Sequence, residues 1–277
     1  MIAAPGPAAV ETYLERWALV PDGDPIVTAV ARLLPVRRHG APAMLKLSAA
    51  EEEPVAGALM AWWDGDGAAR VLARDPQALL LERATGQASL SEMARQGLDD
   101  QACRILCSVA GRLHASRSAP PPELMPLAVR FRDLEPAAAA HGGILARCHQ
   151  EACRLLASPR EVCALHGDLH HDNVLDFGPR GWLAIDPHAL VGERGFDFAN
   201  IFTNPDLADP SRPVATDCDR FARRVAIVAA AAGLERTRLL RWILAWTGLS
   251  AAWFLGDGDS AAIDLEVAAL AAAELDR

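Results

Sequence analysis

The sequence predicts an α+β fold of two lobes, a small antiparallel-sheet lobe with one helix and a larger, mainly helical lobe. Two observations predict this fold class. Short apolar runs separated by turn residues dominate the first 84 residues, and helical periodicity dominates almost everything after Gly86. We expect the N-terminal lobe to span residues 1–84 and the C-terminal lobe to span residues 85–277, with a short connector at residues 82–86.

Each expected element of the N-terminal lobe follows from a local pattern. Apolar runs bounded by Pro, Gly and Asp predict strands at residues 26–30, 43–47, 69–73 and 78–82. Acidic residues ahead of an apolar stretch predict a helix over residues 51–63, which the Asp-Gly-Asp-Gly segment at residues 64–67 ends. The helix is therefore expected between the second and the third strand.

The C-terminal lobe is predicted from helical periodicity. Helices are expected at residues 89–97, 101–114, 143–156 and through most of 217–275, with a proline-rich loop at residues 116–126. A strand–turn–strand unit is expected at residues 165–186. The most hydrophobic stretch, residues 239–255, contains Arg241, Thr247 and Ser250, so we interpret it as a buried helix rather than a membrane span.

Composition and charge narrow the class of partner. The 277-residue chain is 51% hydrophobic and 23% charged, as expected for a globular protein, and its formal net charge is −9. Nucleic acids and anionic membranes bind surfaces rich in Lys and Arg, so we expect neither as a partner. A cationic small molecule is compatible with the charge, and the oligomeric state is left open.

Two further features point to an intracellular setting. Residues 1–10 contain no basic side chain, so we expect no targeting signal there. The cysteines include no C-x-x-C pair, and we expect them to be reduced core residues of a cytoplasmic protein. They are Cys103, Cys107, Cys148, Cys153, Cys163 and Cys218.

The densest polar cluster is HGDLHHDN at residues 166–173. Asp168 precedes Asn173 by five positions, which is the spacing of the catalytic loop in phosphoryl-transfer enzymes. At this spacing a carboxylate can face an acceptor hydroxyl while the amide oxygen faces a metal ion. The interpretation without catalysis is a polar loop that caps a strand.

A hairpin directly after this cluster supplies a third polar group. A four-residue turn at residues 178–181 would pair Phe177 with Trp182 and bring Asn173 opposite Asp186. Two oxygen ligands would then meet at the open end of the hairpin, as Mg²⁺ requires. The competing interpretation is a transition-metal site, since H-x-D-x-H-H offers nitrogen and oxygen ligands. We favour Mg²⁺ and phosphoryl transfer because Asp186 is suitably placed and a strand carries the chain's lone lysine.

That lysine, Lys46, is the only one among 27 basic residues, the other 26 being arginine. It lies in the apolar strand predicted at residues 43–47, where a compact ammonium suits a site that a planar guanidinium would not fit. Kinases hold the α- and β-phosphates with such a lysine, oriented by a helix glutamate. Glu53 is our first candidate for that partner and Glu52 is the alternative. An arginine-biased composition is the competing explanation for a single lysine.

Three segments around these residues carry a family resemblance. They are LHGDLHHDNV at residues 165–174, IDP at residues 185–187 and GFDFAN at residues 195–200. Together they resemble the aminoglycoside phosphotransferase family of the protein-kinase-like fold. WWDGDGAAR at residues 62–70, RGWLAIDP at residues 180–187 and LSAAW at residues 249–253 are similar to its branch of streptomycin 6-kinases and hydroxyurea-type antibiotic resistance kinases. The resemblance extends over nearly the whole chain.

The resemblance implies a role for each polar residue named above. Asp168 would be the catalytic base, Asn173 and Asp186 the Mg²⁺ ligands, Lys46 the phosphate-binding lysine and Glu53 its partner, while the backbone of Glu82 and Ala84 would bind the adenine of ATP. Two departures from the kinase pattern are visible. Residues 28–35 contain no glycine-rich loop, and Asp-Pro-His at residues 186–188 stands in place of D-F-G. Within GFDFAN, we expect Asp197 to be a buried anchor that accepts backbone N–H bonds.

We therefore expect an ATP- and Mg²⁺-dependent phosphotransferase that acts on a hydroxyl of a cationic aminoglycoside such as streptomycin. The alternative within the same fold is a metabolic kinase of the choline, homoserine or fructosamine type. Two other classes are a nucleotide-binding regulator without catalysis and a metallohydrolase. The presence together of Asp168, Asn173 and Asp186 argues against the regulator.

Overall fold

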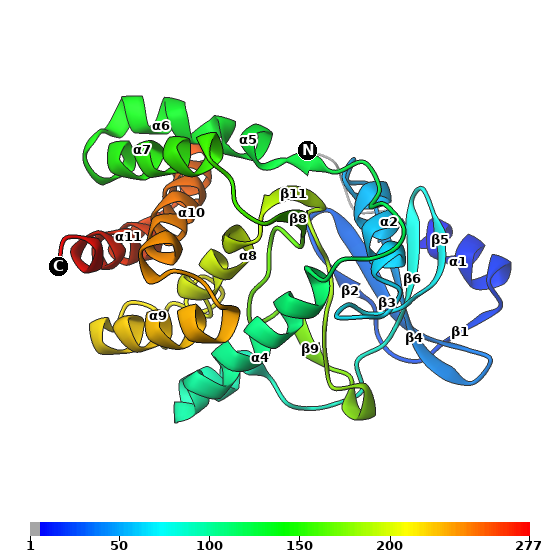
Figure 1. The fold of residues 1–277 in the computed structure, drawn as a ribbon. Helices are drawn as coiled ribbons and strands as arrows, with labels where there is room; N and C mark the ends of the chain where they lie inside the picture. Colours follow the sequence, from blue (N-terminus) through cyan, green and yellow to red (C-terminus); the bar gives the residue numbers. More distant parts are fainter. Residues whose placement is uncertain (1–5) are drawn as a thin grey trace.

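The computed structural model describes residues 6–277 and places a β-sheet at one end of the molecule and most helices at the other (Figure 1). Six strands form the larger sheet in the order β1-β3-β4-β6-β5, with β2 beside β3, and they pair antiparallel. The strands are β1 (Leu19–Pro21), β2 (Ile26–Val27), β3 (Ala31–Arg38), β4 (Ala41–Ser48), β5 (Val71–Asp75) and β6 (Ala78–Glu82). The predicted α+β class is confirmed. Residues 1–5, half of the segment in which we expect no targeting signal, lie outside the described residues.

Two helices accompany this sheet, one more than the sequence predicted. Helix α2 (Glu53–Trp63) begins two residues later than expected and ends at Asp64, whose left-handed φ of 48° breaks it. Helix α1 (Pro7–Arg16) precedes the first strand. Its Tyr13 is buried and donates a hydrogen bond to Asp75 at 3.0 Å, which holds α1 against the sheet. The short apolar stripe of α1 gives only a weak periodic pattern, and for this reason the sequence did not reveal the helix.

Two strand ends differ from the predicted ones because other groups take their hydrogen bonds. Strand β2 ends at Val27 instead of residue 30, since the Oγ1 of Thr28 accepts from the N–H of Ala31 at 3.0 Å and turns the chain. Strand β5 begins at residue 71 instead of residue 69, since the N–H of Ala69 donates to the carbonyl of Ala184 at 2.8 Å. The strands predicted at residues 43–47 and 78–82 are confirmed as β4 and β6.

Helices make up most of the chain after β6. They are α3 (Leu90–Met93), α4 (Asp99–Leu113), α5 (Leu127–Arg130), α6 (Leu134–His141), α7 (Gly143–Ala157), α8 (Gly195–Ala199), α9 (Cys218–Ala232), α10 (Arg236–Asp257) and α11 (Ala262–Leu275). The sequence did not predict α5 and α6, because α5 is only four residues long and the alanine-rich pattern of α6 has little contrast between faces. The helix predicted at residues 89–97 is interrupted, because Gly97 adopts a φ of 90° inside a π-helical turn.

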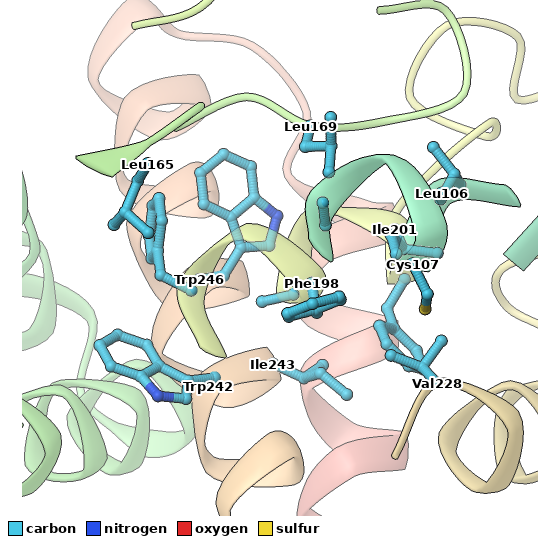
Figure 2. Packing of buried hydrophobic residues seen from close by; sticks show 14 of the residues in the cluster. Leu106, Cys107, Leu165, Leu169, Phe198, Ile201, Val228, Trp242, Ile243 and Trp246 are labelled. Atoms are coloured by element: carbon cyan, nitrogen blue, oxygen red, sulfur yellow. The ribbon is translucent and has the colours of Figure 1, made fainter. Parts of the chain in front are cut away.

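Helix α10 lies at the centre of the helical lobe. Figure 2 shows its Trp242, Ile243 and Trp246 packed with side chains from α4, α8 and α9, and none of the three is more than 5% exposed. Burying an apolar side chain such as Ile243 stabilises the fold by about 1.5–3 kcal/mol. By length and composition α10 could cross a membrane, but most of it is buried in the protein, as the sequence predicted.

The remaining strands form two small sheets. One pairs β9 (Val174–Asp176) with β10 (Trp182–Ala184), and the other places β11 (Leu190–Glu193) between β7 (Met125–Pro126) and β8 (Val162–Leu165). The β9–β10 hairpin differs by one residue from the predicted register, because Asp176 and not Phe177 opposes Trp182. A 3₁₀ turn followed by Gly181, with a φ of 73°, lengthens the connection by one residue.

The shifted register changes the pairing predicted for the two candidate metal ligands, Asn173 and Asp186. The N–H of Ile185 donates to the carbonyl of Asn173 at 2.9 Å, so Asn173 lies opposite Ile185 and Asp186 follows one position later. The predicted pairing of Asn173 with Asp186 was therefore wrong in register. Both residues nevertheless lie at the open end of the hairpin.

Backbone contacts join the hairpin to the sheet lobe. The N–H of Ala184 donates to the carbonyl of Gly67 at 2.8 Å, and the N–H of Gly86 donates to the carbonyl of Asp176 at 2.9 Å. The segment after β6 is thus held against the hairpin that carries the polar cluster. The division of the chain between residues 84 and 85 stays a prediction.

The cysteines differ in exposure: three are buried, two are exposed, and Cys163 is intermediate. All six are free thiols. Burial raises the pKa of Cys103, Cys107 and Cys148 to about 12, so these are inert core residues as expected. Cys153 and Cys218 are exposed, so the prediction of a core position was wrong for these two. Both lie on helix surfaces. The sequence did not reveal this because a side chain as small as cysteine is accommodated both in a core and at a surface.

Candidate active site

Lys46 lies in the middle of β4, between Leu33 of β3 and Leu79 of β6. Its Nζ donates to Glu53 at 2.8 Å and to Asp186 at 2.5 Å. Burial disfavours the ammonium, but the two carboxylates outweigh that effect and raise the pKa of Lys46. The lysine is therefore charged and held at the boundary between the two lobes.

The two adjacent glutamates at the start of α2 have different partners. Glu53, the first residue of the helix, contacts Lys46, whereas the carboxylate of Glu52 lies 3.1 Å from Nδ1 of His188. The hydrogen bond with His188 lowers the pKa of Glu52. Helical rotation separates neighbouring side chains by about 100°, so the two carboxylates point in different directions. The structure thus pairs Lys46 with Glu53, our first candidate.

Asp168 has a hydrogen bond on each carboxylate oxygen. Its Oδ2 accepts from the amide of Asn173 at 2.9 Å, and its Oδ1 accepts from the amide of Asn200 at 2.7 Å. Burial raises the pKa of Asp168, but the neighbouring histidines, His170 above all, bring it down to about 2. Asp168 is therefore an ionised, fixed acceptor throughout the physiological pH range.

The loop that carries Asp168 is anchored from below by α8. Asp197 accepts from the backbone N–H of His166 and of Gly167, each at 2.8 Å, and contacts Nε2 of His114 at 2.8 Å. Gly167 adopts a φ of 85° and leaves no room for a Cβ beside the side chain of Leu190. The buried anchor predicted for Asp197 is confirmed.

Asn173 and Asp186 have the donor chemistry of a hard-cation site. The two hydrogen bonds of the Asn173 side chain, to the backbone and to the carboxylate of Asp168, use its NH₂ group and leave its oxygen Oδ1 for a cation. Asp186 offers its second carboxylate oxygen beside the contact with Lys46. Within residues 6–277 no group of three or more His, Cys, Asp or Glu side chains could hold a metal ion, so the transition-metal alternative gains no support. These two oxygen ligands suit Mg²⁺ completed by phosphate oxygens.

A cavity of about 350 Å³ lies between the sheet and the β9–β10 hairpin. Apolar side chains from both lobes form most of its lining, which includes Met44, Met60, Leu81, Leu175 and Phe177. Lys46 and Asp186 lie at one end, and Glu82 and Ala84 belong to its wall. The N–H of Glu82 already donates to the carbonyl of Arg70 at 3.0 Å, so only its carbonyl is left to face a ligand.

An adjoining cavity of about 330 Å³ shares Lys46 and Asp186 with the first. Asp168 and His188 line it, and so does the turn after β2, where Thr28 and Val30 lie. The sequence has no glycine-rich loop over the site, and this turn lies in the place of that loop. The second cavity therefore joins Lys46, Asp186 and Asp168 in one space.

The sequence analysis did not predict a role for two residues of this site. Asn200 ends the GFDFAN segment, but its contact with Asp168 depends on how α8 packs under the loop. His188 reaches Glu52 across 136 positions of the chain, and no local pattern indicates that contact. The spacing between segments gives no signal for either pair.

An apolar cavity between a sheet and a helical lobe, bordered by a lysine–glutamate pair and by two aspartates, is the arrangement of kinase-like phosphotransferases. Over residues 16–258 the chain matches the family described as aminoglycoside/hydroxyurea antibiotic resistance kinase, and it belongs to this family. It is a phosphotransferase, as the sequence predicted.

Three curated relatives are similar over most of their length. The chain is 58% identical over 267 residues to streptomycin 3″-kinase of Klebsiella pneumoniae, covering 95% of this chain and 100% of the relative. It is 32% identical to streptomycin 6-kinase of Streptomyces griseus, covering 95% and 87% of the two chains. It is 33% identical to hydroxyurea phosphotransferase of Kitasatospora aureofaciens, covering 95% and 77%.

Solved structures show the same fold at low sequence identity. The apo form of a thermostable mutant of aminoglycoside phosphotransferase APH(4)-Ia superposes with a TM-score of 0.68 at 15% identity, covering 96% of this chain and 99% of that one. A choline/ethanolamine kinase family protein from Mesorhizobium loti gives a TM-score of 0.64 at 17% identity, covering 95% and 94%. These likenesses confirm the predicted two-lobe, protein-kinase-like fold.

Proposed function

We propose that this enzyme transfers the γ-phosphoryl group of ATP to a hydroxyl of streptomycin, and that the hydroxyl is the one at position 3″. The observation that carries the transfer chemistry is the ionised Asp168, held by Asn173 and Asn200 beside the cavity that Lys46 enters. The choice of acceptor and position rests on the 58% identity to a streptomycin 3″-kinase, against 32% to a streptomycin 6-kinase. The formal net charge of −9 is compatible with a cationic acceptor.

In this proposal Asp168 orients the acceptor hydroxyl for attack on the γ-phosphorus. The hydroxyl oxygen bonds to phosphorus, the bond between the γ-phosphorus and the bridging oxygen breaks, and ADP leaves. The hydroxyl proton passes to Asp168 and from there to solvent. Because the pKa of Asp168 is about 2, it is a weak base, and most of its contribution is the orientation of the hydroxyl.

Lys46 and the apolar cavity hold the nucleotide. The Lys46 ammonium neutralises charge on the phosphates, and Glu53 prevents it from turning away. In this proposal the adenine lies between the sheet and the hairpin, where Glu82 and Ala84 line the cavity, and the backbone of these two residues binds it. Asn173 and Asp186 would hold Mg²⁺, which supplies charge neutralisation at the β- and γ-phosphates.

The proposal is tested with purified enzyme, ATP and Mg²⁺. Phosphate transfer to streptomycin is followed by ADP release, and the phosphorylated carbon of the product is assigned by two-dimensional ¹H–³¹P NMR. We expect a single product with a phosphate at position 3″. A product phosphorylated at position 6 would overturn the position and keep the acceptor. Transfer to hydroxyurea but not to streptomycin would overturn the acceptor.

A further inference from the structure

His188 occupies a position that none of the roles described so far uses. It lies in the strap that connects β10 with β11, two residues after Asp186. The strap has left-handed backbone at both Asp186 (φ 60°) and Ala189 (φ 54°), a conformation that side chains with a Cβ rarely adopt. Strain of this kind persists only where the surroundings determine it. Here the N–H of His188 donates to the carbonyl of His166 at 2.7 Å and fixes the strap on the catalytic loop.

The imidazole of His188 faces both lobes. Its Nδ1 lies 3.1 Å from the carboxylate of Glu52 in the sheet lobe, and its Nε2 lies 4.0 Å from Oδ2 of Asp168 in the helical lobe. A carboxylate can only accept a hydrogen bond, so Glu52 places a proton on Nδ1 and sets the orientation of the ring. The ring then stands beside Asp168 at the wall of the cavity where the phosphate would transfer.

These contacts form a closed ring across the cleft. Lys46 contacts Glu53, and the next residue back along the chain, Glu52, contacts His188. Two residues before His188, Asp186 contacts Lys46 and completes the circuit. Each link is either a short polar contact or one or two peptide units, so no link can move far without opening another.

We propose that His188 is a positioning residue that closes this ring and thereby holds Lys46 in a fixed position relative to Asp168. The inference rests on the proposed function for the roles of Asp168 and Lys46. His188 acts through Glu52 and through its place beside Asp168. Its removal frees the start of α2 and, with it, the Glu53 carboxylate that orients Lys46.

The test compares a substitution that removes both contacts of the imidazole with one that keeps a single contact. His188→Ala removes both contacts, whereas His188→Asn keeps a donor near the position of Nδ1 and with it the contact to Glu52. For His188→Ala and for Glu52→Ala we expect kcat to fall about 10- to 100-fold, the range found when a residue that orients a ligand is removed. We expect His188→Asn to recover most of that loss, and the double variant to be no worse than the worse single variant.

Matched controls separate this role from general destabilisation. Glu51→Ala removes an exposed carboxylate next to Glu52, and His141→Ala removes an exposed histidine at the end of α6. Both should leave kcat unchanged. All rates are divided by the concentration of nucleotide-binding sites, so a loss of folded protein does not count as a loss of kcat.

A second readout needs no acceptor, so it tests the ring even where the proposed acceptor is wrong. Lys46 is the only lysine, so an amine-directed reagent labels one side chain besides the N-terminus. Opening the ring should speed the labelling of Lys46 in His188→Ala and Glu52→Ala but not in Glu51→Ala. Unchanged labelling together with unchanged kcat in His188→Ala would overturn the proposal. So would equal losses in the Ala and Asn variants, because Asn keeps the contact to Glu52.

Discussion

Two side chains at the boundary between the lobes determine what the site can do. The charge of Lys46 is stabilised by Glu53 and Asp186, and Asp168 has both oxygens engaged by amide donors. Polar groups that are fixed before substrate arrives need little reorganisation during the reaction, and most catalytic stabilisation arises from such fixed charges. Substitution of either residue should therefore affect chemistry more than folding.

Asp168→Asn should lower kcat by about 10²–10⁴-fold, because an amide can neither orient the acceptor hydroxyl as the carboxylate does nor take its proton. Nucleotide affinity should stay nearly unchanged, because Asp168 does not line the cavity proposed for the adenine. Steady-state kinetics with streptomycin and calorimetric binding of ATP provide the two measurements. A variant with normal turnover would remove Asp168 from the mechanism.

Lys46→Arg should be poorly tolerated, because a planar guanidinium cannot reproduce the two short contacts of one ammonium nitrogen with Glu53 and Asp186. In the wild type, modification of the Lys46 amine should abolish activity at a stoichiometry near one, and ATP with Mg²⁺ should protect against it. Mass spectrometry of the labelled peptide is read beside residual activity. Labelling that ATP does not slow, in an enzyme that stays active, would mean that Lys46 is a plain strand residue.

At the scale of single elements, the loop at residues 166–173 depends on the helix that lies beneath it. Asp197 of α8 holds the loop by its backbone, and the β9–β10 hairpin brings Asp186 back to the same edge. Arg224 of α9 joins this helix to α4 and to the segment after α8. It is 1% exposed and pairs with Asp99 of α4 at 2.7 Å while donating to the carbonyl of Asn204 at 2.8 Å. The loop geometry therefore depends on how α8 packs beneath the loop.

Asn173→Ala and Asp186→Ala should each weaken Mg²⁺–nucleotide binding. Their effects should be less than additive, because in the proposed site the loop and the hairpin share one ion. Isothermal calorimetry of ATP binding in the presence of Mg²⁺ to the wild type, the two single variants and the double variant gives the four values of the cycle, and the same titrations without Mg²⁺ are the control. Additive losses would show that the two residues act on separate sites.

Asp99→Ala should destabilise the fold by about 3–5 kcal/mol, because it leaves the buried Arg224 guanidinium without its carboxylate. The matched control is Asp100→Ala, which breaks the exposed pair of Asp100 with Arg223 one position away and should change stability little. Urea unfolding followed by tryptophan fluorescence measures both. Equal effects of the two substitutions would contradict the role given to burial.

At the scale of the whole molecule, the two lobes make one site because several polar contacts join them. The hairpin is hydrogen-bonded to the segment that follows α2, the connector is held at Gly86, and Lys46 meets Asp186 across 140 positions of the chain. These contacts hold a cavity that is lined from both sides. Stability of the whole fold also depends on one buried carboxyl far from this site.

Asp264 of α11 is completely buried, and burial raises its pKa to about 7. Between the unfolded pKa near 3.8 and pH 7 the folded protein binds more protons than the unfolded one, so stability falls as the pH rises through this range. Asp264→Asn should remove this dependence and be more stable than the wild type at pH 8, by about 1.4 kcal/mol for each pKa unit of the shift.

Urea unfolding at pH 5 and at pH 8 tests this prediction. The exposed Asp259, in the turn between α10 and α11, supplies the control: Asp259→Asn should leave the pH dependence as it is in the wild type. A wild type that is equally stable at both pH values would show that Asp264 is ionised in the folded protein.

The local features of this protein could be predicted from the sequence. The spacing of Asp168 and Asn173, the lone Lys46 in an apolar run and the strands at residues 43–47 and 78–82 are written in adjacent residues. Local patterns encode them because turn chemistry, periodicity and motif spacing depend on neighbours in the chain. The family and the two-lobe fold followed from the same motifs.

Only the tertiary structure decided which groups meet. It chose Glu53 over Glu52 as the partner of Lys46, shifted the β9–β10 register by one residue and brought Asn200 and His188 to Asp168. These contacts depend on the direction in which a helix presents each side chain, on one extra residue in a turn and on how α8 packs under a loop. Such quantities arise from long-range packing, so no window of neighbouring residues contains them.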